Sequence, residues 1–286
     1  MAPENLVWMH EKIIASHALN VKKLSVKNYR NAMSLTDALK SSASGALMIG
    51  KYLAPFHFIF SSFYPCMGRS YKMSIGIIGS GALGSNLARA FAKKGISATI
   101  ATRRGPESLA SLISEVGPSI KAGTVAEAAS ADIVIVAVRF EDLGTALGNL
   151  PAWNNRIVID GTNAVAFLEP GSPETQDPTN PLAAYGIKAI DLGDKQSSEV
   201  FSTFVPGARV VKAFNHLDVA ALVEPELSGG QRVLFYSGDD AAAKTEVRTL
   251  IENTGFSAVD LGSLAVGGQL AGLPFGSLSA INFIKV

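Results

Sequence analysis

Cysteine is nearly absent from this sequence, in which Cys66 is the one cysteine among 286 residues. A single cysteine excludes a disulfide framework and a cysteine-based metal site within one chain. Low cysteine usage is typical of proteins in a reducing compartment, so we expect a cytoplasmic protein.

Charge of one sign and long apolar runs are also lacking. The net charge is +1, which gives no global electrostatic attraction to nucleic acid, and we expect no nucleic-acid partner. A membrane-spanning helix needs about 20 consecutive apolar residues. The best window, residues 45–60 (GALMIGKYLAPFHFIF), is interrupted by Lys51, Pro55 and His57, so we expect no membrane partner.

Histidine is scarce beyond Met73, where His216 is the one remaining histidine and no cysteine occurs. This part of the chain therefore offers no Cys/His metal cluster and no cysteine nucleophile, and we predict no metal site.

The composition changes abruptly at Met73. Residues 1–72 contain nine Lys or Arg and three Asp or Glu, a net charge of +6, so the remaining residues carry −5 of the total of +1. All six methionines lie within the first 73 residues. We expect residues 1–72 to be an atypical N-terminal extension, poorly packed or not native, with helices near 4–19 and 34–50. Met73 would then be the native start.

Two other interpretations of residues 1–72 stay open. The segment is basic and contains serines, as a transit peptide does, although its lysines outnumber its arginines seven to two. The second open interpretation is that residues 1–72 form a membrane anchor or an interfacial segment. The intact mass of the native protein tests the non-native extension, because a mass matching 286 residues contradicts a start at Met73.

Apolar runs alternate with helical patterns from Met73 onward. The order predicts βαβ units and a Rossmann-type, doubly wound α/β fold with a mostly parallel sheet. We expect a Rossmann domain at 73–165 and a smaller C-terminal α/β portion at 166–286 that packs on the same sheet. The expected strands are 74–79, 97–104, 132–138, 156–163, 208–216, 231–240 and 256–262, and the expected helices are 84–95, 107–117, 124–131, 142–150, 197–204 and 241–255.

The stretch GSGALG follows the first of these strands and opens a helix within a βαβ unit. This context makes the glycine pattern a dinucleotide-binding motif. Gly79 allows the tight turn, Gly81 lets the backbone approach a pyrophosphate, and Gly84 lets the helix pack closely on the strand. Free N–H groups near Ala82 and Leu83 would bind phosphate oxygens.

The end of the second strand selects the cofactor. An NAD site places a carboxylate there for the ribose 2′-hydroxyl, whereas this chain has Thr102, Arg103 and Arg104, with Arg103 nineteen residues after Gly84. A carboxylate repels a 2′-phosphate and an arginine fork binds one, so we predict NADP(H).

Five segments, IGIIGSGALG, ATRR, VIDGTN, PGARVVKAFNH and VLFYSGDD, occur in this order. With them, residues 73–286 resemble the NADPH-dependent reductases of coenzyme F420, an 8-hydroxy-5-deazaflavin. The cytosolic reductase domain of the STEAP metalloreductases belongs to the same broader group. The resemblance does not extend to residues 1–72. It implies an oxidoreductase that transfers a hydride between NADP(H) and a flavin or deazaflavin.

The resemblance also implies roles for individual residues. It assigns the pyrophosphate to Gly79, Ser80, Gly81, Ala82, Leu83 and Gly84, and the 2′-phosphate to Thr102, Arg103 and Arg104. It places Val138 and Arg139 beside the nicotinamide, and Asn163, Ala213, Phe214, Asn215 and His216 on the acceptor side.

Three polar residues have competing interpretations. His216 either hydrogen-bonds the acceptor ring, as a tentative catalytic residue, or caps the helix that follows it. Lys212 marks a sheet edge or an ion pair rather than a catalytic site. Asp160 is a structural turn residue or a cofactor-side contact.

The sequence leaves three candidates for the hydride acceptor: FMN, FAD and 8-hydroxy-5-deazaflavin. One alternative function is an NADP-dependent dehydrogenase of a small imine or hydroxy acid, and another is a non-catalytic NADPH-binding redox sensor. The glycine-rich, apolar segment 262–286 should pack on the sheet or form a homodimer interface.

Overall fold

A central β-sheet organises the computed structural model, which describes residues 73–286. Six parallel strands form its main part, β10 joins β8 antiparallel, and β11 pairs parallel with β10. This mostly parallel sheet confirms the Rossmann-type fold. In spatial order the strands are β3 (Ile120–Gly123), β2 (Ala98–Ala101), β1 (Ile75–Ile78), β4 (Ile133–Val136), β5 (Ile157–Asp160), β8 (Arg209–Ala213), β10 (Gly230–Gly238) and β11 (Ser257–Asp260).

The expectations for residues 1–72, their two helices and their origin, lie outside the described residues. The described residues lie within one compact unit. The proposed boundary between 73–165 and 166–286 stays a prediction.

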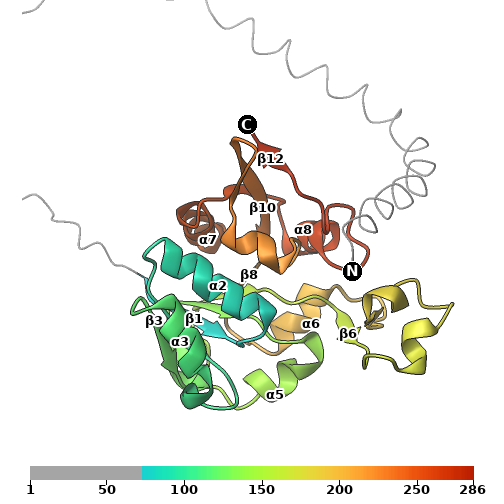
Figure 1. Ribbon diagram of the computed structural model, residues 1–286, viewed down its shortest axis with the longest axis horizontal. Helices are drawn as coiled ribbons and strands as arrows, with labels where there is room; N and C mark the ends of the chain where they lie inside the picture. Colours follow the sequence, from blue (N-terminus) through green and yellow to red (C-terminus); the bar gives the residue numbers. More distant parts are fainter. Residues whose placement is uncertain (1–72) are drawn as a thin grey trace, which may run out of the picture. The chain divides into compact units, whose positions relative to one another are not determined.

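Four short strands lie off the main path of the sheet. β9 (Glu226–Leu227) and β12 (Ile284–Lys285) pair antiparallel with the beginning of β10. β6 (Val165–Phe167) and β7 (Ile187–Ala189) form a separate antiparallel ribbon, and the segment between them extends to the side of the sheet (Figure 1).

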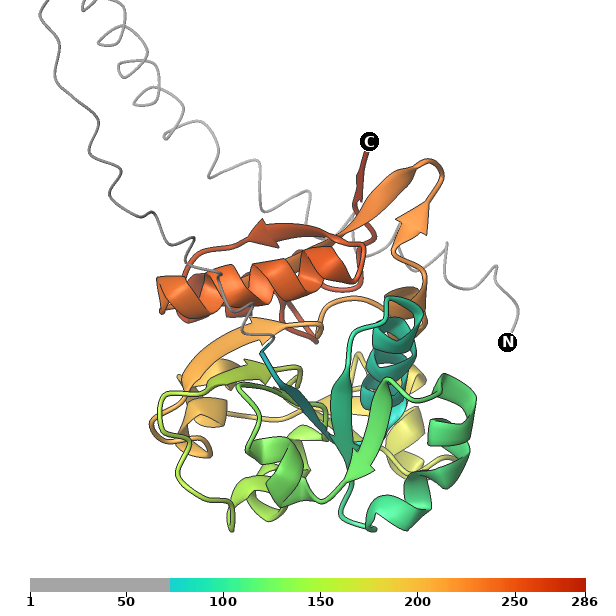
Figure 2. The ribbon, with the colours of Figure 1, turned by 90° about the vertical axis from the view of Figure 1, so that its left-hand side faces the viewer.

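Helices cover both faces of the sheet. One buried cluster joins the sheet to α2, α3 and α7, and a second joins it to α4, α5 and α6. Figure 2 shows α7 beside β11, its neighbour along the chain. The bounds are α2 (Ala82–Lys93), α3 (Ala110–Val116), α4 (Val125–Ala129), α5 (Leu143–Leu147), α6 (Ser197–Thr203), α7 (Ala241–Asn253) and α8 (Leu264–Ala271), with single-turn helices η1 (Pro106–Leu109), η2 (Phe140–Asp142), η3 (Pro173–Gln176), η4 (Ala183–Tyr185) and η5 (Val219–Val223).

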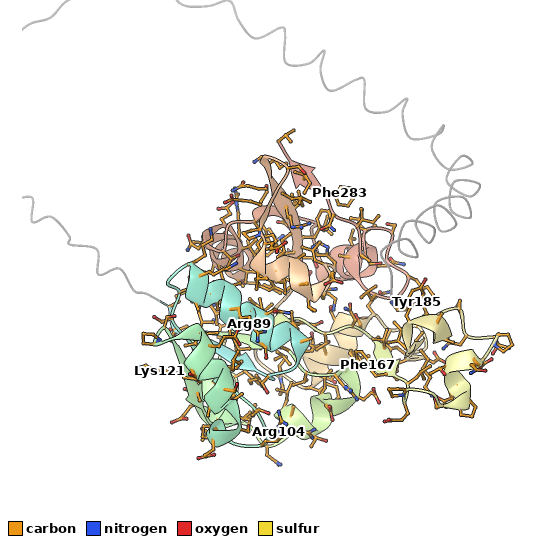
Figure 3. All side chains as sticks on the ribbon, in the orientation of Figure 1. Arg89, Arg104, Lys121, Phe167, Tyr185 and Phe283 are labelled. Carbon is orange, nitrogen blue, oxygen red and sulfur yellow. The ribbon has the colours of Figure 1, made fainter. Side chains whose placement is uncertain are left out.

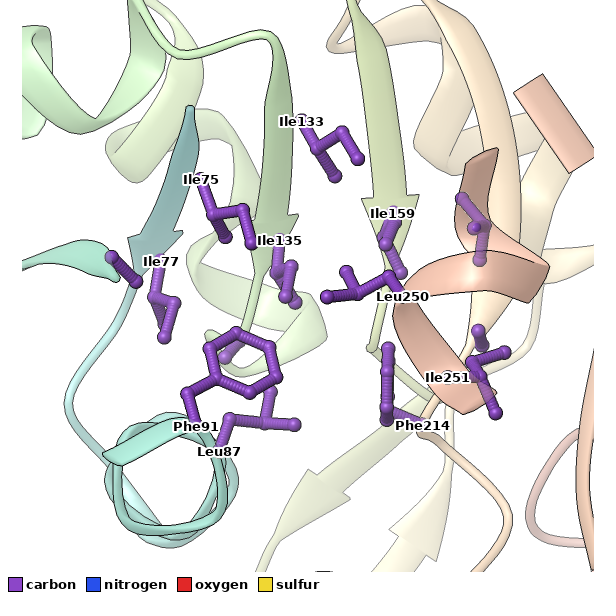
Figure 4. Packing of buried hydrophobic residues seen from close by; sticks show 14 of the residues in the cluster. Ile75, Ile77, Leu87, Phe91, Ile133, Ile135, Ile159, Phe214, Leu250 and Ile251 are labelled. Atoms are coloured by element: carbon purple, nitrogen blue, oxygen red, sulfur yellow. The ribbon is translucent and has the colours of Figure 1, made fainter. Parts of the chain in front are cut away.

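The strands are apolar on both sides because successive residues face opposite helical layers. Ile75 and Ile77 lie in the cluster of α2 and α7, whereas Ile78 lies in the cluster of α4 and α5. Figure 4 shows isoleucines of β1, β4 and β5 near Phe91 of α2 and Leu250 of α7. Each such side chain stabilises the fold by about 1.5–3 kcal/mol when fully buried.

The C-terminal segment packs on the sheet through α8, which contacts β8 and β10. A Cβ at Gly267 would collide with the side chain of Ser237 in β10, so glycine permits this close approach. An Asn163–Leu273 hydrogen bond and the β12–β10 pairing fix the rest of the segment.

Candidate functional site

A cleft of about 810 Å³ opens at the carboxyl ends of β1, β2, β4 and β5. β1 and β4 are neighbours from which the strand order runs in opposite directions. Open α/β sheets bind ligands at such a switch point. Thirteen of the sequence-predicted site residues line this one cleft: Gly79, Ser80, Gly81, Ala82, Leu83, Thr102, Arg103, Arg104, Val138, Arg139, Asn163, Phe214 and Asn215.

The glycine-rich turn between β1 and α2 forms the floor of the cleft. Gly79 has φ of +110°, and a Cβ there would collide with the carbonyl of Ala137 at the end of β4. A Cβ at Gly84 would collide with the carbonyl oxygen of Gly79, so the helix lies directly against the turn. Gly81 has no atom within 4 Å of its Cβ position, and its backbone is open to the cleft.

The amino terminus of α2 provides free hydrogen-bond donors. Its N-cap is Gly81, no side chain caps it, and its first turn contains no acidic residue. The first N–H groups of a helix have no partner within the helix and favour anions. The arrangement therefore fits a phosphate group at Ala82 and Leu83.

Two arginines lie at the end of β2. Arg104 is exposed (Figure 3), and Arg103 Nη2 lies 3.3 Å from Asp142 Oδ1 across the cleft. The side chains of Arg103 and Asp142 are 55% and 37% exposed, and such exposed pairs contribute only about 0–1 kcal/mol to stability. A phosphate dianion could replace the carboxylate of Asp142 at Arg103 with little loss of stability.

A hydrogen-bonded wall closes the opposite side of the cleft. Asn163 Nδ2 donates to the carbonyl of Asn215 at 2.8 Å, and Asn215 Nδ2 donates back to Asn163 Oδ1 at 3.0 Å. Asn215 Nδ2 also donates to the carbonyl of Ala271, and the N–H of Leu273 donates to Asn163 Oδ1. Buried Phe214, with φ of +65°, completes the wall. The C-terminal segment is thereby joined to the cleft.

Three sequence-predicted residues do not line the cleft: Gly84, Ala213 and His216. Gly84 packs against the turn, and Ala213 is buried in β8 opposite Tyr236. The expectation that His216 contacts the acceptor needs correction, because its ring is fully buried and packs on Phe235, with centroids 4.9 Å apart. His216 Nε2 accepts a hydrogen bond from the N–H of Phe235. The alternative as a helix cap also fails, since Asp218 caps η5.

Burial lowers the pKa of His216 to about 4. An unfolded histidine has a pKa of about 6.5, so the unfolded chain binds the proton more readily. The stability that neutral His216 contributes is present above pH 6.5 and is lost as the pH falls toward 4. We expect the free energy of unfolding to fall by about 3 kcal/mol across this window. Urea unfolding at several pH values tests this. In His216→Gln the free energy of unfolding should depend less steeply on pH between 6.5 and 4. An unchanged pH dependence in this variant would contradict the assignment to His216.

Lys212 and Asp160 form a buried ion pair beside the cleft. Lys212 Nζ donates to Asp160 Oδ2 at 2.8 Å and to the carbonyl of Thr162 at 2.9 Å. Asp160 Oδ1 accepts from the N–H and the hydroxyl of Thr162, and Ser198 donates to Oδ2. Lys212 lies in β8, between β5 and β10, so of the two structural interpretations the ion pair is observed and the sheet edge is not.

Sequence reasoning missed three notable residues of the cleft: Asp142, Phe167 and Leu273. Phe167 is a large apolar side chain that stays 51% exposed (Figure 3), and the cation of Arg139 lies 4.8 Å from its ring centroid. No local pattern marks these residues, because each reaches the cleft through a tertiary contact.

Among residues 73–286, no helix combines the length and the apolar character needed to cross a membrane.

Comparisons with known proteins agree with this architecture. The family model described as NADP oxidoreductase coenzyme F420-dependent matches residues 74–164. The crystal structure of the hypothetical protein SMa0349 from Sinorhizobium meliloti is similar, with 39% identity, a TM-score of 0.65, and coverage of 75% of this chain and 96% of that chain. A candidate F420-dependent NADP reductase from an Arthrobacter species has 28% identity and a TM-score of 0.55, covering 68% of this chain and 86% of its own.

A metalloreductase is also similar. The rat (Rattus norvegicus) metalloreductase STEAP3 is 28% identical over 203 residues, which are 70% of this chain and 36% of the rat protein. The chain thus spans about a third of that relative's length. Taken together, these similarities show that residues 74–164 belong to the family described as NADP oxidoreductase coenzyme F420-dependent, and that the fold extends over most of the Sinorhizobium protein.

Proposed function

We propose that residues 73–286 transfer a hydride between NADP(H) and a flavin or deazaflavin acceptor. The observation that supports this most is that one cleft of about 810 Å³ is lined both by the glycine-rich turn between β1 and α2 and by the hydrogen-bonded wall of Asn163, Phe214 and Asn215. Enzyme pockets for small ligands and cofactors commonly measure about 300–1,000 Å³. The Arthrobacter relative is named as a candidate F420-dependent NADP reductase and the rat relative as a metalloreductase, and both names are consistent with redox chemistry.

The residues of the cleft fit NADP(H) at three places. The open backbone at Gly81 and the free N–H groups of α2 would bind the pyrophosphate. Arg103 and Arg104 would bind the 2′-phosphate. Val138 would border the nicotinamide, which supplies a hydride with both of its electrons, while a solvent proton completes the reduced acceptor.

The hydrogen-bonded wall of Asn163, Asn215 and Phe214 would hold the ring of the hydride acceptor in place and exclude water. Phe214 and Leu273 are apolar, and the Asn163–Asn215 pair is held by its own hydrogen bonds, so this wall is rigid before a ligand enters. A rigid wall lowers the entropic cost of aligning two rings.

The decisive experiment measures NADPH oxidation with FMN, FAD and 8-hydroxy-5-deazaflavin supplied separately, on protein beginning at Met73 and on the full chain. Turnover with at least one of them is expected. Tight NADPH binding without turnover would favour the redox sensor. Turnover only with an imine or a hydroxy acid would favour the dehydrogenase.

Cofactor choice is testable by replacing both Arg103 and Arg104 with Ala. We expect the Kd for NADPH to rise about 100-fold, because two charge-assisted contacts to the 2′-phosphate are lost. The Kd for NADH should change by less than about threefold, since it has no such phosphate. Isothermal titration with both nucleotides measures this. Arg248→Ala, an exposed arginine paired with Glu252 on α7, is the matched control. Equal losses for NADPH and NADH would contradict the assignment.

The proposal includes a cytoplasmic protein that forms a homodimer. Exposed Val266, Phe275 and Phe283 near the C-terminus would supply apolar interface area. Light scattering measures the oligomeric state, and a monomer at all concentrations would contradict this part.

A further inference from the structure

Arg139 and Phe167 form a cationic corner of the cleft, distinct from the corner of Arg103 and Arg104. Arg139 follows β4 and Phe167 lies in the β6–β7 ribbon. The guanidinium carbon of Arg139 lies 4.8 Å from the ring centroid of Phe167, and both residues line the cleft. Arg103 is turned toward Asp142 instead. The cleft thus has two separated sites for negative charge.

The charge of Arg139 is not compensated within the described part of the chain. In residues 73–286 its side chain makes no ion pair and no hydrogen bond. Asp142 is the one carboxylate among the residues lining the cleft, and Arg103 engages it. Glu141 is next but one in sequence to Arg139, and its carboxylate accepts from the N–H of Phe167. Arg139 is therefore available to an anionic ligand.

The cation–π contact with Phe167 holds this guanidinium over the aromatic ring, 4.8 Å from its centroid. The five N–H donors of the Arg139 guanidinium make no hydrogen bond within residues 73–286. These donors can bind two oxygens of a phosphate in a bidentate fork. Phe167 thus acts as a positioning residue, which explains why a large aromatic side chain remains 51% exposed.

From this geometry we propose that Arg139, positioned by Phe167, binds the phosphate of the hydride acceptor's side chain. The acceptor is then a phosphorylated flavin or deazaflavin rather than an unphosphorylated one. This inference rests on the proposed function, because it assigns a ligand group to the acceptor half of the same cleft.

FMN and riboflavin test the inference, since they differ only by the phosphate. Two readouts are used: kcat/KM for NADPH oxidation, and the Kd of each flavin for protein saturated with NADP+, measured by flavin fluorescence. The native protein should favour FMN by about tenfold or more in both. The same comparison applies to the deazaflavin with and without its phosphate.

Variants identify the residues responsible. Arg139→Gln should abolish the preference for FMN, so that the FMN-to-riboflavin ratios of kcat/KM and of Kd both approach one. Phe167→Ala should reduce the preference, and Phe167→Tyr, which keeps the ring, should retain it. The matched control is Lys188→Gln in β7, which removes an exposed cation that does not line the cleft, and it should change nothing.

The outcomes separate this inference from the proposed function. Turnover that is equal with FMN and riboflavin, or a preference that survives Arg139→Gln, overturns the inference and leaves the proposed function standing. No turnover with any flavin or deazaflavin overturns both. An increased Kd for NADPH in Arg139→Gln with an unchanged flavin preference would assign Arg139 to the cofactor instead.

Discussion

Gly81→Ala is expected to fold as the native protein does and to lose NADPH binding by at least about 100-fold. Gly81 has φ of −71° and ψ of −166°, which alanine adopts without strain, and nothing lies within 4 Å of the added methyl group. The same methyl would occupy the space where a pyrophosphate approaches the backbone. Thermal unfolding should show an unchanged Tm, and titration with NADPH should show the loss.

Gly84→Ala provides the contrasting control in the same motif. Its added methyl would collide with the carbonyl oxygen of Gly79, so α2 must move away from the turn. Such overpacking costs about 1–3 kcal/mol or more, and the Tm should fall. If Gly81→Ala bound NADPH normally, the open backbone would not be the pyrophosphate site. A fall in its Tm equal to that of Gly84→Ala would make Gly81 a structural glycine.

Local sequence patterns were sufficient to predict the parallel strands at the core of the fold. The strands containing Ile75–Ile78, Ile133–Val136 and Ile157–Asp160 are continuous apolar runs, because both faces of each strand are buried. The strand β3 (Ile120–Gly123) was missed, since it lies at a sheet edge, exposes Lys121 and ends in glycine. The helix α8 was missed because its glycines are unfavourable for helices in isolation.

The site was predictable where its residues follow strands in a regular order. Residues after β1, β2, β4, β5 and β8 meet at one edge of a parallel sheet, so the motif, the arginine pair and the asparagines lie together in the cleft. The position of His216 was not predictable, because its side chain points into the packing around Phe235. The contribution of Phe167 depends on a ribbon outside the main sheet, for which no sequence pattern exists.

Lys212 and Asp160 explain why charged residues are tolerated inside β5 and β8. Their side chains are 1% and 0% exposed, and each is satisfied by further hydrogen bonds to Thr162 or Ser198. Burying either charge alone would be expensive, because desolvation costs several kcal/mol per ion. The pair also holds Thr162, which lines the cleft, next to β8. Its structural contribution should therefore exceed that of any exposed ion pair in residues 73–286.

Lys212→Met should lower the free energy of unfolding by about 3–5 kcal/mol, because the carboxylate of Asp160 remains buried without its cation. Asp160→Asn should also destabilise the fold, since it leaves the ammonium unpaired. The double variant Lys212→Met/Asp160→Asn should be more stable than the sum of the two losses predicts, because no unpaired charge remains. Urea unfolding of the four proteins forms the thermodynamic cycle, and Lys188→Met, which breaks the exposed pair with Glu174, should cost about 0–1 kcal/mol. A Lys212→Met protein with native stability but no hydride transfer would instead make Lys212 part of the catalytic machinery.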